Sequence, residues 1–502
     1  MECVLCSLAS GSRAEKALNV SNNCDTARWD ASLGASILSS NSYFECSALR
    51  LEMFLRRTPA LESFMPLLRR AERYFEFAAL GTNWKTECLA GITTFMTMAY
   101  IIFVNPSILH EAGMPVAGVT AATCLAAAIG SILMGVLARY PIALAPGMGL
   151  NAYFTYSVVK GMGVDWHVAL GAVFLSGVAF LLLTAAGVRQ MIVRAIPSEL
   201  YSAVAAGVGL FIALIGFRNS GIVVPSASTT VTLGNLRSPE TLLALFGLLA
   251  IAVCLCAGLK AAILIGVIAT WLVAILTGAA HWQPQPYSVR DITATAFQLD
   301  IPAALRLGLV EIVFVFLFVD LFDNVGTLLA VGKKARLFEH AAGVPRMNRI
   351  LFSDAIATVV GSLAGTSTVV SYVESAAGVA AGGRSGVTAI VTGLLFAVAL
   401  FVAPLAGTIP GAATAPALII VGSMMMTAAA DIPWSDPEVA IPAFLTMTAI
   451  PLTWSIANGL AFGFCAWTLI RIFRGRFREV NWMVYALTAL FLVRFYYMGA
   501  SR

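Results

Sequence analysis

The fold follows from two Gly-rich stretches, PIALAPGMGLNAYFTYSVV (residues 141–159) and GTSTVVSYVESAAGVAAGG (residues 365–383). Each stretch is short and rich in small residues, and each lies third in a series of seven apolar runs. Such paired, Gly-interrupted segments in matching positions of two halves are typical of a transporter that binds its substrate between repeats. Ends of half-helices would present N–H and C=O groups to the ligand there. For isolated glycines elsewhere, close helix packing stays the preferred interpretation.

The composition indicates an integral membrane protein. The chain has 502 residues, of which 59% are hydrophobic and 11% charged, and its mean hydropathy is +0.87. A soluble globular chain carries about 25% charged residues, so this chain could not cover the surface of an ordinary cytosolic enzyme. The net charge of +5 is too small to indicate a nucleic-acid partner. We therefore expect many helices that cross a bilayer.

Fourteen apolar runs can be counted between residues 88 and 471. Lys and Arg gather before the first run, between residues 333 and 349, and between residues 471 and 478. If the short third run counts as a span, all three basic groups face the cytoplasm, as the positive-inside rule requires. Seven runs per half then make the second half run in the opposite sense. The runs lie at 88–108, 119–139, 146–160, 167–187, 199–217, 239–257, 261–280, 309–332, 350–364, 370–381, 385–405, 411–428, 439–452 and 454–471.

This count predicts an all-α integral membrane protein with 14 transmembrane helices in two inverted seven-helix repeats and with short, broken third and tenth spans. An additional run at 481–498 contains Arg494, and its placement stays open. The predicted parts are an N-terminal extension (1–70), a first repeat (71–280), an external loop (281–308), a second repeat (309–471), and a basic segment with a C-terminal apolar helix (472–502).

The N-terminal extension is unlike the remaining chain, because residues 1–87 carry 20 of the 57 charged residues. Two interpretations are open for residues 1–70. They form a disordered tail, or the start codon is assigned too early and translation begins at Met53 or Met65. A metal site is disfavoured, because the Cys3-x-x-Cys6 pair has no second pair of ligands.

Acidic residues inside the apolar runs are the main functional signal, because an ionisable group at membrane depth is costly unless it faces a cavity or a partner. Asp320 and Asp323 lie on one face of the eighth run, and Glu374 lies in the short tenth run. A carboxylate accepts two N–H donors side by side, as the edges of purine and pyrimidine bases present them. The alternative for each acid is a structural partner for a Lys or a helix end. That alternative is favoured for Asp354 and Glu311.

Long motifs along the chain resemble those of the AzgA-like purine permeases, a branch of the nucleobase–cation/ascorbate symporter superfamily. The resemblance runs from about residue 74 to residue 497 without large gaps. The motifs that carry it are GTNWKTECLAGITTFMTMAYIIFVNPSIL (81–109), ALAPGMGLNAYFTYSV (143–158), LFVDLFDNVGTLLAVG (317–332), GTSTVVSYVESAAGVAAGGRSG (365–386) and IPAFLTMTAIPLTWSIANGLAFGF (441–464).

The resemblance implies core and gate domains, an elevator-like movement of one against the other, and often a homodimer. It also implies a substrate site built from an acid of the eighth span, an acid of the tenth and the Asn-Ala-aromatic stretch of the third. The aromatic rings could stack on a base, and their alternative role is packing in the core or against lipid. The expected substrate-binding residues are Asp323, Glu374, Asn151, Ala152, Tyr153 and Phe154, with Thr93 and Thr94 as secondary contacts. The expected proton-coupling candidates are Glu374, Asp323 and Asp320.

The sequence therefore predicts a multi-pass protein of the inner or plasma membrane, with a cytoplasmic N-terminus, that imports adenine, guanine or hypoxanthine together with protons. The expected partners are the base, the bilayer and a second copy of the chain, and the coupling proton takes the place of a cofactor. An enzyme is not expected, because neither His-Glu-x-x-His nor Gly-x-Ser-x-Gly occurs. The alternatives are a symporter for another planar solute, such as uracil or xanthine, and, less favoured, a channel.

Overall fold

The computed structural model describes residues 59–280, 288–306, 309–334, 346–402 and 407–500. The chain forms two units, Met1–Ala71 and Glu72–Arg502. In the first unit, the described residues of the expected 1–70 extension form most of helix α3 (Pro59–Tyr74). Pro59 suits the first position of a helix, where its missing N–H costs nothing. Residues 1–58 of that extension lie outside the described residues.

Helices also account for most of the chain between Trp84 and Leu276. Short polar side chains begin several of them: the Asn83 side chain accepts a hydrogen bond from the backbone N–H of Thr86, and the Ser238 side chain accepts one from that of Thr241. These helices are α5 (Trp84–Met98), α6 (Ile101–His110), α7 (Val116–Leu133), α9 (Trp166–Ala185), α10 (Val188–Ala195), α11 (Ser198–Asn219), α12 (Pro239–Cys256) and α13 (Ala262–Leu276).

The second half repeats this helical character. Ser385 and Ser455 begin two of its helices with the same kind of hydrogen bond. The helices are α16 (Leu309–Lys334), α17 (Met347–Ala364), α18 (Ser375–Ala380), α19 (Gly386–Ala399), α21 (Gly411–Met425), α22 (Pro437–Leu452), α23 (Ile456–Phe473) and α24 (Trp482–Ala500).

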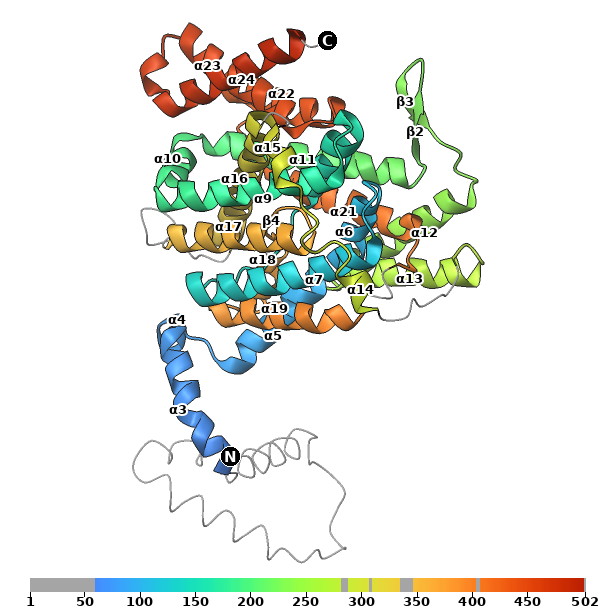
Figure 1. Ribbon diagram of the computed structural model, residues 1–502, viewed down its shortest axis with the longest axis vertical. Helices are drawn as coiled ribbons and strands as arrows, with labels where there is room; N and C mark the ends of the chain where they lie inside the picture. The colour runs from blue at the N-terminus through green and yellow to red at the C-terminus, as the bar shows by residue number, and fades with distance from the viewer. Residues whose placement is uncertain (1–58, 281–287, 307–308, 335–345, 403–406, 501–502) are drawn as a thin grey trace, which may run out of the picture. The chain divides into compact units, whose positions relative to one another are not determined.

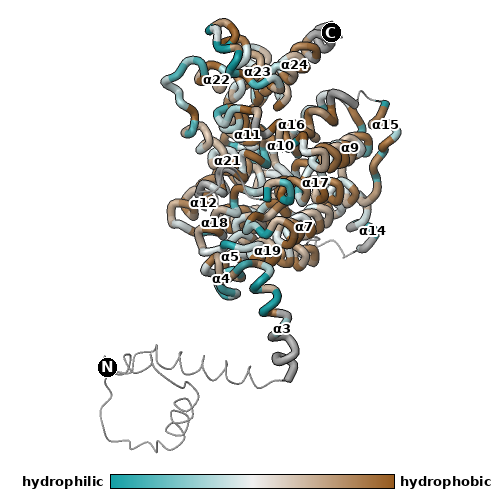
Figure 2. The backbone as a smooth tube through the Cα atoms, turned by 90° about the vertical axis from the view of Figure 1, so that its left-hand side faces the viewer, coloured by the Kyte–Doolittle hydropathy of each residue, from teal (hydrophilic) through white to brown (hydrophobic). Residues whose placement is uncertain are grey.

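Apolar residues run along most of these helices, as the brown colour of α7, α9 and α17 in Figure 2 shows. Among the described residues, seven helical stretches are long and apolar enough to cross a membrane, and four shorter helices are also apolar. A chain with this many apolar helices is a multi-pass membrane protein.

The two Gly-rich stretches are not continuous helices. In the first, strand β1 (Leu144–Pro146) leads into α8 (Met148–Ala152) and a π-helical segment, Tyr153–Gly161. In the second, strand β4 (Val369–Ser371) precedes α18. The two strands pair antiparallel, with Leu144 opposite Ser371 and Pro146 opposite Val369. The pairing satisfies backbone groups that water cannot reach inside a membrane, and it joins the two halves of the chain. Strand β4 lies beside α17, as labelled in Figure 1.

The long helices pack as two sets. In one set, α5 and α7 pack against α19, and α17 packs against α7 and α9. In the other, α11 packs against α21 and α22, α12 against α13 and α21, and α22 against α23. The backbones of α11 and α21 approach closely at Gly209 and Gly422, because a Cβ atom at Gly422 would lie 2.4 Å from the Gly209 carbonyl oxygen. Helix α16 contacts both α9 and α11.

A buried carboxylate ties α5 to α19. Glu87, in the first turn of α5, is fully buried. Its oxygens accept hydrogen bonds from the backbone N–H groups of Arg384 and Ser385, which start α19, and from the hydroxyls of Thr82 and Thr388. A negative charge is favourable at the N-terminal ends of two helices, so this acid holds the first and second halves of the chain together.

A second acid joins three chain segments near the end of α7. The Glu76 carboxylate accepts hydrogen bonds from Arg139 at 3.1 Å and from Arg346 at 2.6 Å. All three residues have positive φ angles, near 60°. The hydrogen bond and charge of Arg346 hold the pKa of Glu76 below its usual value. Three segments therefore meet at one end of the helices: Glu76 before the first span, Arg139 after the second and Arg346 before the ninth.

The polar stretch expected as a loop at 281–308 contains two short helices, α14 (Val289–Ile292) and α15 (Ile301–Arg306). Between them, the backbone N–H of Phe297 donates to the carbonyl of Leu363 at 2.8 Å, so this stretch covers the C-terminal end of α17. Residues 281–287 and 307–308 lie outside the described residues. A hairpin of β2 (Val223–Ser226) and β3 (Thr230–Leu233) separates α11 from α12.

Candidate substrate site

A cavity of about 440 Å³ lies where the paired Gly-rich segments meet α11, α16 and α21. This volume is within the range of small-molecule sites. Both sets of helices contribute to its wall: the segment Val370–Glu374 and Met148 on one side, and α11, α21 and the turn Met426–Asp431 on the other. The cavity is therefore bounded by elements that are far apart in the sequence.

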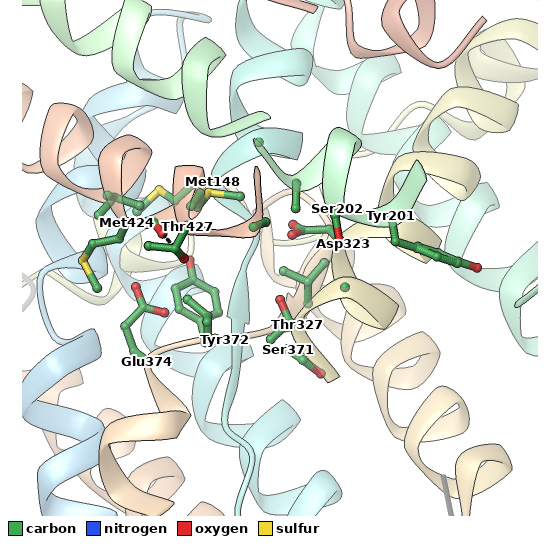
Figure 3. A pocket seen from close by; sticks show the side chains of 18 of the residues that line it. Met148, Tyr201, Ser202, Asp323, Thr327, Ser371, Tyr372, Glu374, Met424 and Thr427 are labelled. Carbon is green, nitrogen blue, oxygen red and sulfur yellow. Dashed lines mark hydrogen bonds between the residues drawn. The ribbon is translucent and has the colours of Figure 1, made fainter. Parts of the chain in front are cut away.

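Three carboxylates line the cavity: Asp323 and Glu374, from the expected acidic positions in the second half, and Asp431, which is exposed at the end of the turn Met426–Asp431. Asp323 projects from α16 and is half-buried, and Glu374 follows β4 and is 8% exposed. Figure 3 shows them on different sides of Tyr372. The hydroxyl of Tyr100 donates a hydrogen bond to Oε1 of Glu374 at 2.6 Å. The second oxygen of Glu374 and both oxygens of Asp323 can accept further donors from a ligand.

Gly147 explains how Asp323 comes to lie beside the paired strands. A Cβ atom at Gly147 would be 2.9 Å from Val370 and 3.5 Å from Oδ2 of Asp323, so only a residue without a side chain allows this approach. Gly326, one turn along α16 from Asp323, also lines the cavity, and a Cβ atom there would meet no atom within 4 Å. The space beside Asp323 is thus left open by the absence of a side chain.

The rest of the cavity wall is mixed in polarity. Hydroxyl groups come from Ser202, Thr327 and Thr427, and thioethers come from Met148 and Met424 (Figure 3). Such a wall of apolar groups with a few directed polar ones is typical of small-molecule sites. Methionine side chains also adapt their shape to different ligands.

Asn151, which the sequence analysis expected to bind the substrate, does not line the cavity. It is fully buried, donates to Oδ1 of Asn105 and accepts from the hydroxyl of Ser367. Asn105 in turn donates to Thr123 at 2.7 Å and to Thr366 at 3.0 Å. Helix α8 turns Met148 and Gly149 toward the cavity. Asn151, two positions after Gly149, therefore lies on another face of the helix.

The neighbouring expected residues are also packed away from the cavity. Ala152 and Phe154 are fully buried, and the Tyr153 ring packs edge-on against Phe316 at a centroid distance of 5.2 Å. On α5, Thr93 and Thr94 are buried, and the Thr94 hydroxyl lies against Gly378 of α18. The structure thus brings Asp323 and Glu374 to the cavity, whereas the residues that stay outside it are Asn151, Ala152, Tyr153, Phe154, Thr93, Thr94 and Asp320.

Several cavity residues carry no clear signal in the sequence. Tyr100 could have been found, because a tyrosine at the break between two apolar helices needs a hydrogen-bond partner for its hydroxyl. Tyr372, whose hydroxyl donates to the carbonyl of Pro146, lies within a quoted motif but is not acidic. Ser202 and Thr427 come from helices that have no intramembrane charge. Among the described residues, no group of three or more His, Cys, Asp or Glu side chains could hold a metal ion.

Residues 85–495 match the model of a family described as the permease family. The chain is 43% identical over 437 residues to the guanine/hypoxanthine permease PbuG of Bacillus subtilis, covering 85% of this chain and 99% of that protein. It is 41% identical over 429 residues to the adenine permease AdeP of Escherichia coli, covering 86% and 96%. Among solved structures, the transmembrane domain of the cyanobacterial bicarbonate transporter BicA is similar in fold, with a TM-score of 0.55 at 15% identity, over 76% of this chain and 97% of that one.

Proposed function

Because the chain belongs to the permease family that its residues 85–495 match, we propose that it transports purine nucleobases across a membrane. The observation that carries this proposal is the cavity with carboxylates at Asp323 and Glu374. Guanine, hypoxanthine and adenine are flat and uncharged and present N–H donors at their edges, which a carboxylate accepts in pairs. The names of the relatives PbuG and AdeP support the same class of substrate.

We assign the recognition of the base to three side chains. Glu374, oriented by Tyr100, accepts one N–H edge, and Asp323 accepts another from the far side of the cavity. The ring of Tyr372, which lies between Glu374 and Asp323 in Figure 3, stacks on the face of the base. In this arrangement Asn151 acts by holding α8 to Asn105 and Ser367 rather than by touching the base.

The transport step is proposed to be an elevator-like movement of one helix set against the other. The cavity lies between the two sets, and the paired strands tie the two Gly-rich segments into one of them. The proposed architecture is the inverted pair of seven-helix repeats with 14 spans, in which the segments with β1 and β4 count as the third and tenth. A core and a gate domain, a homodimer and an inner or plasma membrane location belong to the same proposal.

A cytoplasmic N-terminus is supported by the cluster around Glu76. Residues 76, 139 and 346 meet there, and the span count puts all three on the same side of the membrane. Arg139 and Arg346 then obey the positive-inside rule. Import is proposed to be driven by protons that move with the base.

Uptake of radiolabelled hypoxanthine into proteoliposomes tests the proposal. Glu374→Ala and Asp323→Ala should abolish uptake while the purified variants stay monodisperse. Glu240→Ala, which removes an exposed carboxylate at the start of α12, serves as the matched control and should transport normally. Competition by unlabelled adenine, guanine, xanthine and uracil identifies the accepted bases. Normal uptake by either cavity variant, or competition by uracil alone, contradicts the proposal.

A further inference from the structure

A second charged group lies inside the helices, away from the cavity. It consists of Arg189 of α10, Asp354 of α17, and Asp320 and Asn324 of α16, and we refer to it as the Arg189 cluster. Arg189 is 1% exposed and the other three side chains are fully buried. None of the four lines the substrate cavity. Buried ionisable groups at membrane depth are costly, so this cluster calls for a function.

The guanidinium of Arg189 is engaged by one of the two acids. It donates to Oδ2 of Asp354 at 2.7 Å and to the carbonyl of Leu351 at 3.0 Å, and it stacks over the Phe180 ring at 4.0 Å. This geometry fixes one positive charge against one carboxylate. The partner of Asp354 is thus Arg189, whereas the sequence analysis expected a Lys or a helix end.

Asp320 is the acid without such a partner. Neither of its oxygens makes a hydrogen bond to any residue that the structure describes, whereas the side chain of Asn324 lies against Asp354. The charged groups within electrostatic range of Asp320 are Asp354, Arg189 and Asp323. If both acids of the cluster are ionised, one buried negative charge has no compensation. A bound proton on Asp320 makes the cluster neutral.

Building on the proposed function, we propose that Asp320 is the site of the coupled proton and that the Arg189–Asp354 pair tunes it. Asp323 and Glu374 face the cavity and accept the base, so their oxygens serve recognition. Asp320 lies one helical turn from Asp323, which gives a proton from the cavity a short route to it. An O–H bond forms on Asp320 on one side of the membrane and breaks on the other, and no other bond changes.

The coupling follows from the cost of moving charge. With the proton bound, the Arg189 cluster carries no net charge while the helices move. Without the proton, movement carries one uncompensated carboxylate more, besides those of Asp323 and Glu374, through a medium of low polarity. We therefore expect one proton to cross with each base.

Two transport modes in proteoliposomes separate coupling from binding. A pH gradient should drive about tenfold accumulation of hypoxanthine per pH unit in the wild-type protein, because one proton is worth about 1.4 kcal/mol per unit. Asp320→Asn, which has the shape of the protonated acid, should lose this accumulation and the accompanying proton influx. It should retain exchange of internal for external hypoxanthine. The control Glu240→Gln should behave as wild type in both modes.

Asp320→Asn that accumulates hypoxanthine about tenfold per pH unit overturns the inference. If this variant does not fold, the charge-neutral double variant Arg189→Gln/Asp354→Asn replaces it, since Asp320 then has no guanidinium to favour release of its proton. Its loss of proton influx with retained exchange supports the assignment, and retained influx refutes it. Wild-type net uptake of hypoxanthine without any proton influx also refutes the inference but leaves purine transport standing. A wild-type protein that moves no purine base refutes the proposed function itself.

Discussion

Replacing Glu87 by Gln should destabilise the protein without changing its substrate preference. The wild-type carboxylate accepts hydrogen bonds from Thr82 at 2.7 Å, Arg384 at 3.0 Å, Ser385 at 3.2 Å and Thr388 at 2.6 Å. Gln keeps one oxygen for the donors around Oε1. Its amide group, however, faces the N–H of Ser385, which also lies 3.2 Å from Oε2.

The size of the loss can be worked out from these contacts. The loss of one hydrogen bond to a charged acceptor lowers the free energy of unfolding by about 1.5–3 kcal/mol. The loss of the negative charge at the N-terminal ends of α5 and α19 lowers it by about 0.3–1 kcal/mol more. Thr388 can rotate its hydroxyl and accept from the new amide, so its contact is largely kept. The expected destabilisation is therefore about 2–4 kcal/mol.

Thermal denaturation of the detergent-purified protein, followed by the monodisperse fraction after heating, measures this effect. Glu240→Gln is the matched control, since it removes an exposed acid in the first turn of α12 and should change stability by less than about 0.5 kcal/mol. Hypoxanthine uptake per folded molecule should stay unchanged in both variants. An unchanged melting temperature for Glu87→Gln would show that the link between α5 and α19 does not stabilise the fold.

Two other features give predictions of the same kind. Gly326→Ala should fold normally, because its Cβ meets no atom within 4 Å, yet it should weaken the affinity for guanine about tenfold or more by filling the space beside Asp323. Competition assays measure this affinity, with Gly411→Ala outside the cavity as the control. A guanine affinity equal to that of the wild type would contradict the prediction. The pKa of Glu76 is lowered mainly by its hydrogen bond to Arg346, so the stability that it contributes is present above its usual pKa of 4.5 and is lost as the pH falls below that value. Melting curves of wild type and Glu76→Gln should thus differ at pH 7 and converge at low pH, and a constant difference would exclude this role.

The helical segments could be predicted from the sequence because membrane helices satisfy their own backbone hydrogen bonds and must be apolar over a fixed length. Each expected run overlaps a helix or one of the two strand-and-helix segments. The acids Asp323 and Glu374 could also be predicted as site residues, because charge is rare at membrane depth. Both line the cavity.

The remaining site residues depend on contacts between distant segments, which periodicity does not reveal. Asn151 and Met148 are three residues apart, and only the direction in which α8 enters the bundle decides which of them faces the cavity. Glu87 sits among the charges of the N-terminal region, and nothing local indicates that it lies at the start of α19. Because Arg189 follows the apolar α9, the sequence indicates a basic residue at a membrane surface. In the structure Arg189 is instead buried against Asp354.

The pairing of β1 with β4 has a consequence for the order in which the protein folds. The partner of Leu144 is Ser371, so more than two hundred residues must be synthesised after the first strand before its backbone groups find their partners. Until then, the first Gly-rich segment cannot be stable as a strand within the membrane, and a contact so distant in sequence forms late. The cavity beside β4 is therefore among the last parts of the protein to form, and a chain that stops before residue 369 would contain most of the helices but not this cavity.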